Sequence, residues 1–400
     1  MLKTYFNHRL IILLQFFISL YIFINIFHLF LDTKEVSTYF KGTIQMKKEV
    51  NQPSKYEVLT QRLDQYLKDN AFNGSVLVTI KDQVILRKAY GYANIQDNVL
   101  ATPKTKYRIG SITKTVVAVA IMQLQEQGRL NIDENVNNYV STFPVETQIT
   151  LRHLLTHTSG LPEQGQGNVE ATSHLKLINW IGAQKLEFPP GTGWRYTDYN
   201  YMVLGYIVEK ISKQPLAKYI KQHIFNPANM KESGIGEKMP EDIFLAEGYR
   251  REDTTLVPAQ KLQMKWLYGC GDMYTTVDDM KKLDEALLTE KLISKKSLSE
   301  VFTVTPVKKY GFSFYVYPDY CHNHGVLAGW NTFNNFNWDK RIFVILFSNV
   351  KNSMDDEFNQ KFRSMVMNLQ NKIQYYPIEK RIYITNESKK LKNHIHKTII

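Results

Sequence analysis

The sequence predicts an α+β domain. Strand-like segments rich in β-branched and aromatic residues lie near both ends of the central part of the chain, over residues 72–88 and 333–347, and helical segments lie between them. The chain has 400 residues, 44% of them hydrophobic and 12% aromatic, so it can bury a sizeable core. We therefore expect the terminal strands to share one sheet, with helices packed against it.

The N-terminal part is predicted to be a membrane anchor. Residues 10–31 carry no formal charge, and a run of this length can cross a hydrocarbon core about 30 Å thick. Lys3 and Arg9 precede the run, which favours a cytoplasmic N-terminus and an exported body, although Lys34 and Lys41 weaken this asymmetry. Neither a cleavage site nor a cysteine for lipid attachment follows. We expect a single-pass protein of the cell membrane, with its globular part outside the cytoplasm.

Composition divides the chain into four parts. Residues 1–31 form the cytoplasmic N-terminus and transmembrane anchor, 32–55 a polar linker, 56–370 the globular domain and 371–400 a basic tail. The formal net charge of +12 favours contact with polyanions. Charge alone does not choose between nucleic acid, anionic lipid and an anionic wall polymer.

The globular domain begins with a helix over residues 56–67, which is followed by a strand, a turn and a second strand over residues 72–88. The next helix continues from Val116 and stops near Gly128. Further helices are expected over residues 150–160, 175–186, 201–211 and 218–225 and from Val277, and strands over residues 310–317, 333–338 and 341–347.

Ser111 and Lys114 stand at the start of the helix that contains Val116. An offset of three places both side chains on one helical face. The helix N-terminus stabilises negative charge developing on the serine, and a lysine one turn on can take its proton if burial lowers the pKa of the ammonium. This S-x-x-K pattern is typical of serine acyl-transfer enzymes, but an ordinary helix also contains it often by chance.

A metal site is not expected. His153 and His157 have the i, i+4 spacing of zinc ligands, but no glutamate follows the first histidine as a metalloprotease helix requires. We expect neither a metal nor any other cofactor.

Several motifs occurring in one order resemble the penicillin-recognising serine hydrolases, in the branch of class C β-lactamases and low-molecular-weight penicillin-binding proteins. The resemblance covers residues 56–370. It rests on the sequences Tyr-Gly-Tyr-Ala at 90–93, Ile-Gly-Ser-Ile-Thr-Lys at 109–114, Leu-Arg-His-Leu-Leu-Thr-His-Thr-Ser-Gly-Leu-Pro at 151–162, Pro-Gly-Thr at 190–192 and Gly-Cys-Gly-Asp-Met-Tyr at 269–274. It implies a β-lactamase/transpeptidase-like fold, in which an antiparallel sheet flanked by helices adjoins an all-helical lobe and the active site lies between them.

The resemblance also implies roles for single residues. Ser111 resembles the acylated nucleophile, Lys114 its partner, and Tyr196 the tyrosine that passes a proton to the leaving group. The family's third motif matches residues 323–325, which are Asn323, His324 and Gly325, on the substrate side of the site. The backbone N–H groups of Ser111 and Val326 would form the oxyanion hole.

Two positions depart from the family pattern. Asp198 replaces the usual asparagine of the second motif, and a carboxylate near Lys114 would raise the pKa of its ammonium and shift the base role toward Tyr196. Asn323 replaces a lysine or histidine, which removes a charge that could hold a substrate carboxylate. His322 or His324 could supply some of that charge if protonated. Broad-spectrum β-lactamase activity is therefore less expected than for a chain with lysine at position 323.

These departures resemble a subset of the family, the membrane-anchored penicillin-binding-like proteins of Gram-positive envelopes of the FmtA and PbpX types. The implied function is cleavage of D-alanyl bonds through a Ser111 acyl-enzyme, either as an esterase on D-alanylated teichoic acid or as a DD-peptidase on peptidoglycan stems, with β-lactams as acylating ligands. The alternative is a catalytically weak, penicillin-binding scaffold protein. A nucleic-acid partner is not expected, because it would rest on charge alone.

Overall fold

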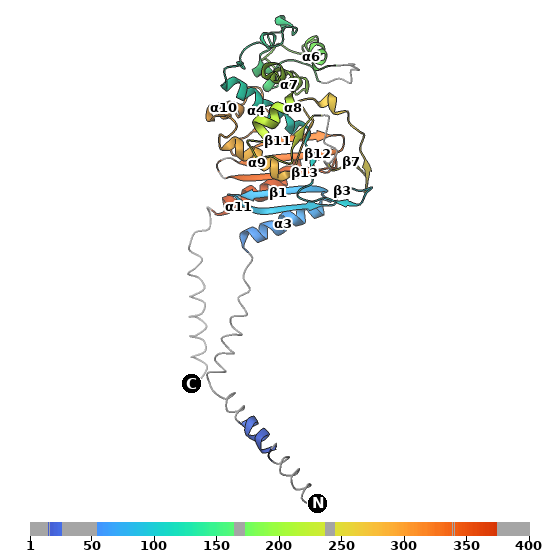
Figure 1. Ribbon diagram of the computed structural model, residues 1–400, viewed down its shortest axis with the longest axis vertical. Helices are drawn as coiled ribbons and strands as arrows, with labels where there is room; N and C mark the ends of the chain where they lie inside the picture. The colour runs from blue at the N-terminus through green and yellow to red at the C-terminus, as the bar shows by residue number, and fades with distance from the viewer. Residues whose placement is uncertain are drawn as a thin grey trace, which may run out of the picture. The chain divides into compact units, whose positions relative to one another are not determined.

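A six-stranded antiparallel sheet, with the strand order β10-β11-β12-β13-β1-β2, forms the centre of the domain (Figure 1). Strand β1, from the N-terminal end, pairs along its whole length with β13, from the C-terminal end, and Gly74 lies opposite Ser348. The expectation that the terminal strands share one sheet is therefore confirmed. The strands are β1 (Gly74–Ile80), β2 (Gln83–Tyr90), β10 (Tyr315–Val316), β11 (Cys321–Leu327), β12 (Trp330–Asn337) and β13 (Ile342–Ser348).

The computed structural model describes residues 15, 17–25, 54–163, 173–236, 245–337, 339 and 341–373. The chain divides into two units, Met1–Lys55 and Tyr56–Ile400. Most of the predicted anchor and linker, and the predicted tail beyond residue 373, lie outside the described residues. Within the anchor, residues 17–25 are helical and exposed. Among the described residues, no helix has both the length and the apolar character needed to span a membrane.

Helices α3 (Lys55–Asp69) and α11 (Asp356–Ile373) cover one face of the sheet (Figure 1). In α3 the buried residues Leu59, Leu63 and Leu67 recur every four positions, which gives the helix one apolar side. Phe358 and Phe362 of α11 follow the same spacing and belong to the same core cluster. This side of the sheet thus has its own small core.

The opposite face carries the larger core and the helical lobe. Helix α4 (Thr113–Glu126) is buried on all sides from Thr113 to Met122, because it runs through the middle of this layer and packs against α7. A helix enclosed in this way needs apolar residues all round, not only on one stripe. The helices of this layer are α4, α5 (Leu151–Leu155), α6 (His174–Gly182), α7 (Tyr199–Ser212), α8 (Leu216–Ile220), α9 (Val277–Leu288) and α10 (Lys295–Val301).

Shorter elements connect these layers. The small sheets pair β3 (Tyr92–Asn94) with β4 (Val99–Leu100), β9 (Met273–Thr275) with β5 (Tyr107–Arg108) and β6 (Gly234–Ile235), and β7 (Tyr249–Glu252) with β8 (Thr255–Pro258). The single helical turns are η1 (Gly110–Ile112), η2 (Val136–Asn138), η3 (Val145–Thr147), η4 (Lys221–Phe225) and η5 (Met264–Leu267).

One predicted strand is mostly wrong. The pattern of residues 310–317 indicates a strand, but the structure has strand geometry only at Tyr315–Val316. The reason is a tight turn, in which Gly311 N donates to Phe314 O and Ser313 has a φ of +72°. Tyr310, Phe312 and Phe314 of this segment are buried in the core without a continuous ladder.

Candidate active site

Ser111 lies in the turn η1, directly before α4, where strand β11 crosses the start of the helix. Gly110 has a φ of +52°, and a Cβ on it would stand 3.0 Å from the amide N of Val326. A Cβ on Gly325 would stand 1.8 Å from Ile109 O. The two glycines therefore allow the backbones of η1 and β11 to touch. This contact brings Val326 beside Ser111, where the sequence predicts two N–H groups of an oxyanion hole.

Lys114 is 1% exposed and its ammonium has three hydrogen-bond acceptors. Nζ donates to Ser111 Oγ at 3.0 Å, to Asp198 Oδ1 at 2.8 Å and to Cys270 O at 2.9 Å. Three acceptors match the three protons of an ammonium. The loop that contains Cys270, between η5 and β9, thus holds Lys114 against the serine.

Tyr196 completes the group. Its hydroxyl donates to Ser111 Oγ at 2.6 Å, and Lys114 Nζ lies 5.0 Å from the centre of its ring. The tyrosine stands just before α7, in a loop fastened by a backbone hydrogen bond from Arg195 N to His157 O. The three residues predicted to act together, from two distant parts of the chain, therefore meet at the oxygen of Ser111.

The charges around this oxygen favour a protonated lysine. Burial lowers the pKa of Lys114, but the Asp198 carboxylate, together with Tyr196 and Cys270, more than offsets this and raises that pKa above its usual value. Burial raises the pKa of Tyr196, and although the Lys114 ammonium opposes that effect, the pKa stays above its usual value. At neutral pH the site thus holds an ammonium and a neutral phenol, so proton removal from Ser111 falls to the small phenolate fraction of Tyr196.

His157 supports Tyr196, a function that the sequence did not reveal. Its ring is fully buried and stacks on the Tyr196 ring at 4.4 Å between centroids. Asn200 Nδ2 and Thr197 N both contact its Nδ1, and burial lowers the pKa of His157 well below its usual range. A neutral imidazole packed there fixes the phenol without adding a charge. The sequence identifies His157 by its zinc-like spacing from His153 and by the family motif of Leu151–Pro162, and neither signal predicts this stacking.

His153, which has zinc-like spacing from His157, caps the start of α5. Its Nδ1 accepts a hydrogen bond from Thr150 N, while Thr150 Oγ1 accepts one from His153 N. This reciprocal pair is a capping box.

The third predicted motif is divided between the two faces of β11, because successive side chains of a strand alternate. Asn323 is buried toward α4, where its Nδ2 donates to Thr115 Oγ1 at 2.7 Å. His324 points to the opposite face, stacks on Phe333 at 3.9 Å and contacts Asn331. The expectation that His324 stands with Ser111 and Asn323 is therefore corrected.

The suggestion that a histidine replaces the missing charge is also wrong. Burial lowers the pKa of His322 to about 3, and it lowers the pKa of His324 as well. Both imidazoles are neutral at pH 7 and both line a cavity on the α11 side. Position 323 thus has no cationic substitute from its two neighbours.

Replacing Asp198 with asparagine should increase turnover of ordinary β-lactams and move the acid limb of the rate profile to lower pH. The carboxylate raises the pKa of both Lys114 and Tyr196, so its removal lowers both values and enlarges the fraction of Tyr196 that can accept a proton. Each unit by which the pKa of Tyr196 falls should give roughly a tenfold increase in that fraction. The measurement is kcat/KM against pH for one penicillin. An unchanged or lower rate would contradict this view of Asp198.

The comparisons with known proteins agree with the geometry. The family model described as Beta-lactamase matches residues 59–364. PbpX of Bacillus subtilis (strain 168), which carries the name of a penicillin-binding protein, is 37% identical over 313 residues that cover 77% of this chain and 80% of PbpX. The teichoic acid D-alanine hydrolase of Staphylococcus aureus (strain MRSA252) is 29% identical over 317 residues, which cover 78% of each chain.

The fold is shared with a solved structure. The crystal structure of FmtA from Staphylococcus aureus matches with a TM-score of 0.71 at 24% sequence identity, and the match covers 82% of this chain and 94% of that chain. The chain therefore belongs to the β-lactamase family and is a serine hydrolase.

Proposed function

We propose that this protein removes D-alanine from teichoic acid at the outer surface of the cell membrane, by hydrolysing the D-alanyl ester through a Ser111 acyl-enzyme. The observation that carries the proposal is the meeting of Tyr196 Oη and Lys114 Nζ at Ser111 Oγ, at 2.6 and 3.0 Å. A hydroxyl so placed can lose its proton to the phenolate of Tyr196 as it attacks a carbonyl carbon.

The reaction needs two steps with balanced proton transfers. Ser111 Oγ attacks the ester carbonyl, its proton passes to the Tyr196 phenolate, and the oxyanion lies against the N–H groups of Ser111 and Val326. Collapse of the tetrahedral intermediate breaks the bond to the polyol oxygen, which takes the proton from Tyr196. Water then attacks the D-alanyl enzyme, loses its proton to Tyr196, and releases D-alanine as the proton returns to Ser111.

The two departures from the family pattern favour an ester of free D-alanine over a stem peptide. Asp198 is 26% exposed, and a carboxylate there can attract the α-ammonium of a D-alanyl ester. The penultimate D-alanine of a stem peptide has no such ammonium, because its nitrogen is in an amide. The terminal D-alanine of a stem peptide has a carboxylate, but at position 323 an amide buried against Thr115 stands in place of the family's cation or imidazole. The name of the relative from Staphylococcus aureus supports the same choice.

The proposed location rests on the sequence. The uncharged run at residues 10–31, with Lys3 and Arg9 before it, suits an anchor that leaves residues 56–370 outside the cytoplasm. The net charge of +12 would favour approach to an anionic wall polymer.

Release of D-alanine tests the proposal directly. The purified full chain is incubated with D-alanylated teichoic acid and, separately, with a stem peptide ending in two D-alanine residues, and free D-alanine is measured. We expect release from teichoic acid to be at least about tenfold faster, with no release by the Ser111→Ala variant. In addition, N-acetylation of the D-alanyl ester should raise KM for the native chain but change it little for Asp198→Asn.

Each other outcome has a distinct meaning. Release of D-alanine from the stem peptide alone would show that the activity is that of a DD-peptidase and not of an esterase. Release from neither substrate, combined with labelling of Ser111 by a fluorescent penicillin, would favour the scaffold function.

A further inference from the structure

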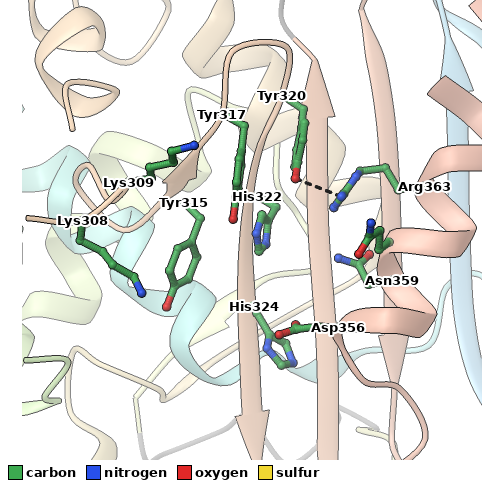
Figure 2. A pocket seen from close by; sticks show the side chains of 11 residues that line it. Lys308, Lys309, Tyr315, Tyr317, Tyr320, His322, His324, Asp356, Asn359 and Arg363 are labelled. Atoms are coloured by element: carbon green, nitrogen blue, oxygen red, sulfur yellow. Dashed lines mark hydrogen bonds between the residues drawn. The ribbon is translucent and has the colours of Figure 1, made fainter. Parts of the chain in front are cut away.

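The polar cavity lined by His322 and His324 lies on the other side of β11 from Asn323, between β10, β11 and the first turns of α11 (Figure 2). Its volume is about 720 Å³. Aromatic rings and cationic side chains make up most of its wall, whereas most ligand pockets are lined mainly by apolar groups. The catalytic steps described above do not use it.

The charge of the cavity is positive. Three cationic side chains line the cavity: Lys308 and Lys309 belong to the loop before β10, and Arg363 belongs to α11. The acidic residue of the wall is Asp356. Among the described residues, these three cations have no carboxylate within ion-pair distance, and Asp356 on the wall offsets one of the three charges.

Arg363 is held in a fixed position. Its Nη2 donates to Tyr320 Oη at 3.0 Å, its Nη1 donates to Asn335 Oδ1 at 3.3 Å, and its guanidinium carbon lies 3.9 Å from the centre of the Tyr320 ring (Figure 2). Both oxygen partners are neutral. A guanidinium oriented in this way, with donors to spare, is suited to a phosphate group.

Flat rings line the same cavity. Tyr317 and Tyr320 stack at 4.6 Å with an angle of 9° between their planes, and His322 lies parallel to Tyr315 at 5.2 Å (Figure 2). The Nδ1 of His322 is buried without a hydrogen-bond partner among the described residues. Because these rings stack on one another, they offer their edges, hydroxyl groups and ring nitrogens to a polyol or sugar.

A chain of side-chain contacts links the cavity to the active site. Lys308 Nζ lies 5.0 Å above the Trp194 ring, and the Trp194 ring lies 6.4 Å from that of Tyr196. Along β11, His324 in the cavity precedes the oxyanion residue Val326 by two positions, a spacing of roughly 7 Å. A polymer bound at Ser111 can thus extend into the cavity.

We propose that this cavity is an accessory subsite, which binds a phosphodiester and the adjoining polyol or sugar of an anionic polymer whose D-alanylated unit lies at Ser111. The phosphate contacts Arg363, and the polyol or sugar lies along the edges of the tyrosine rings. Lys308 and Lys309 lie on the other side of the stacked Tyr317 and Tyr320 and attract the next charged unit of the polymer. The inference deepens the proposed function and rests on it for the identity of the polymer. The subsite would let the enzyme select polymer over short esters.

Binding of a teichoic acid freed of D-alanine tests the subsite without any catalysis. Isothermal titration of the full chain should show that Arg363→Gln weakens binding at least about tenfold. Arg363→Lys should recover part of this loss. The matched control is Lys361→Gln, which removes an equal charge from an exposed position of the same helix outside the cavity and should change Kd less than about twofold.

Arg363→Gln loses two hydrogen bonds and could therefore fold poorly, so a second variant tests the same cavity without removing them. Lys308→Gln combined with Lys309→Gln changes two exposed side chains and should also weaken polymer binding. Both variants should hydrolyse a short D-alanyl ester without phosphate at the native rate, but should lose kcat/KM on the polymer. Equal affinity of the Arg363→Gln and Lys361→Gln variants for the polymer would overturn the proposal.

The assays separate the subsite from the proposed function and from other sources of phosphate. Polymer binding that depends on Arg363, without release of D-alanine, would support the subsite and contradict the proposed esterase activity. Vesicles of phosphatidylglycerol, compared with phosphatidylcholine, test a lipid headgroup, and inorganic phosphate tests the free anion. Binding to the vesicles without binding to the polymer would overturn the assignment. Binding to a stem peptide that depends on Arg363 would also overturn it.

Discussion

Replacing Lys114 with methionine is expected to slow acylation of Ser111 by about 10³-fold. The ammonium donates to Ser111 Oγ and lowers the pKa of Tyr196. Without it, a smaller fraction of Tyr196 is the phenolate that can accept the proton of Ser111. Methionine has a similar length and suits a site that is 1% exposed. The measurement is the single-turnover rate at which a fluorescent penicillin labels Ser111, followed from pH 6 to pH 10. The variant should need a higher pH than the native chain to reach half of its maximal rate.

The same substitution should also cost stability, because it leaves Asp198 and Cys270 O without their donor. Breaking a buried ion pair costs about 3–5 kcal/mol, but Asp198 is 26% exposed and can be hydrated, so a loss of about 1–2 kcal/mol is expected. Adding Asp198→Asn should restore stability, and because it also lowers the pKa of Tyr196 it should recover only part of the rate. A labelling rate within tenfold of the native value would show that Lys114 is not part of the chemistry.

Replacing Gly325 with alanine is expected to destabilise the domain by about 3 kcal/mol and to slow acylation by about 10²-fold. The new Cβ would stand 1.8 Å from Ile109 O and 2.9 Å from Thr332 Oγ1, so β11 must move away from η1. That movement would carry the Val326 amide away from the carbonyl oxygen it is expected to bind. Urea unfolding gives the stability change, and labelling of Ser111 gives the rate.

Gly271→Ala is the matched control for this steric effect. A Cβ on Gly271 would have its nearest neighbour at 3.4 Å, an ordinary contact with the Leu267 side chain. This variant should unfold within about 1 kcal/mol of the native chain. If Gly325→Ala is as stable and as fast as this control, the close contact between β11 and η1 is not needed for the oxyanion hole.

The local patterns of the sequence predicted most of the regular structure. The spacing of Leu59, Leu63 and Leu67 defines one apolar side of a helix, and runs of β-branched and aromatic residues define the strands at each end, because both patterns depend on residues close in the chain. The failure at residues 310–317 came from the turn at Gly311. Its aromatic residues are buried for reasons of packing, which a strand pattern alone does not distinguish.

The candidate site was only partly accessible to the sequence. The motifs selected Ser111, Lys114 and Tyr196, and the structure brings them together. The sequence did not determine the face of β11 on which His324 lies. A shift of one residue in register exchanges the two faces, and register is set by the pairing with β12.

From the sequence alone came the family, the serine and lysine on one helical turn, and the negative charge at position 198. Only the tertiary structure decided that Lys114 has all three of its protons in hydrogen bonds, that His157 lies beneath Tyr196, and that Lys308 and Arg363 share a cavity. The physical reason is distance along the chain. The ion pair of Lys114 and Asp198 joins residues 84 positions apart, and such contacts arise only when the sheet and helices pack together.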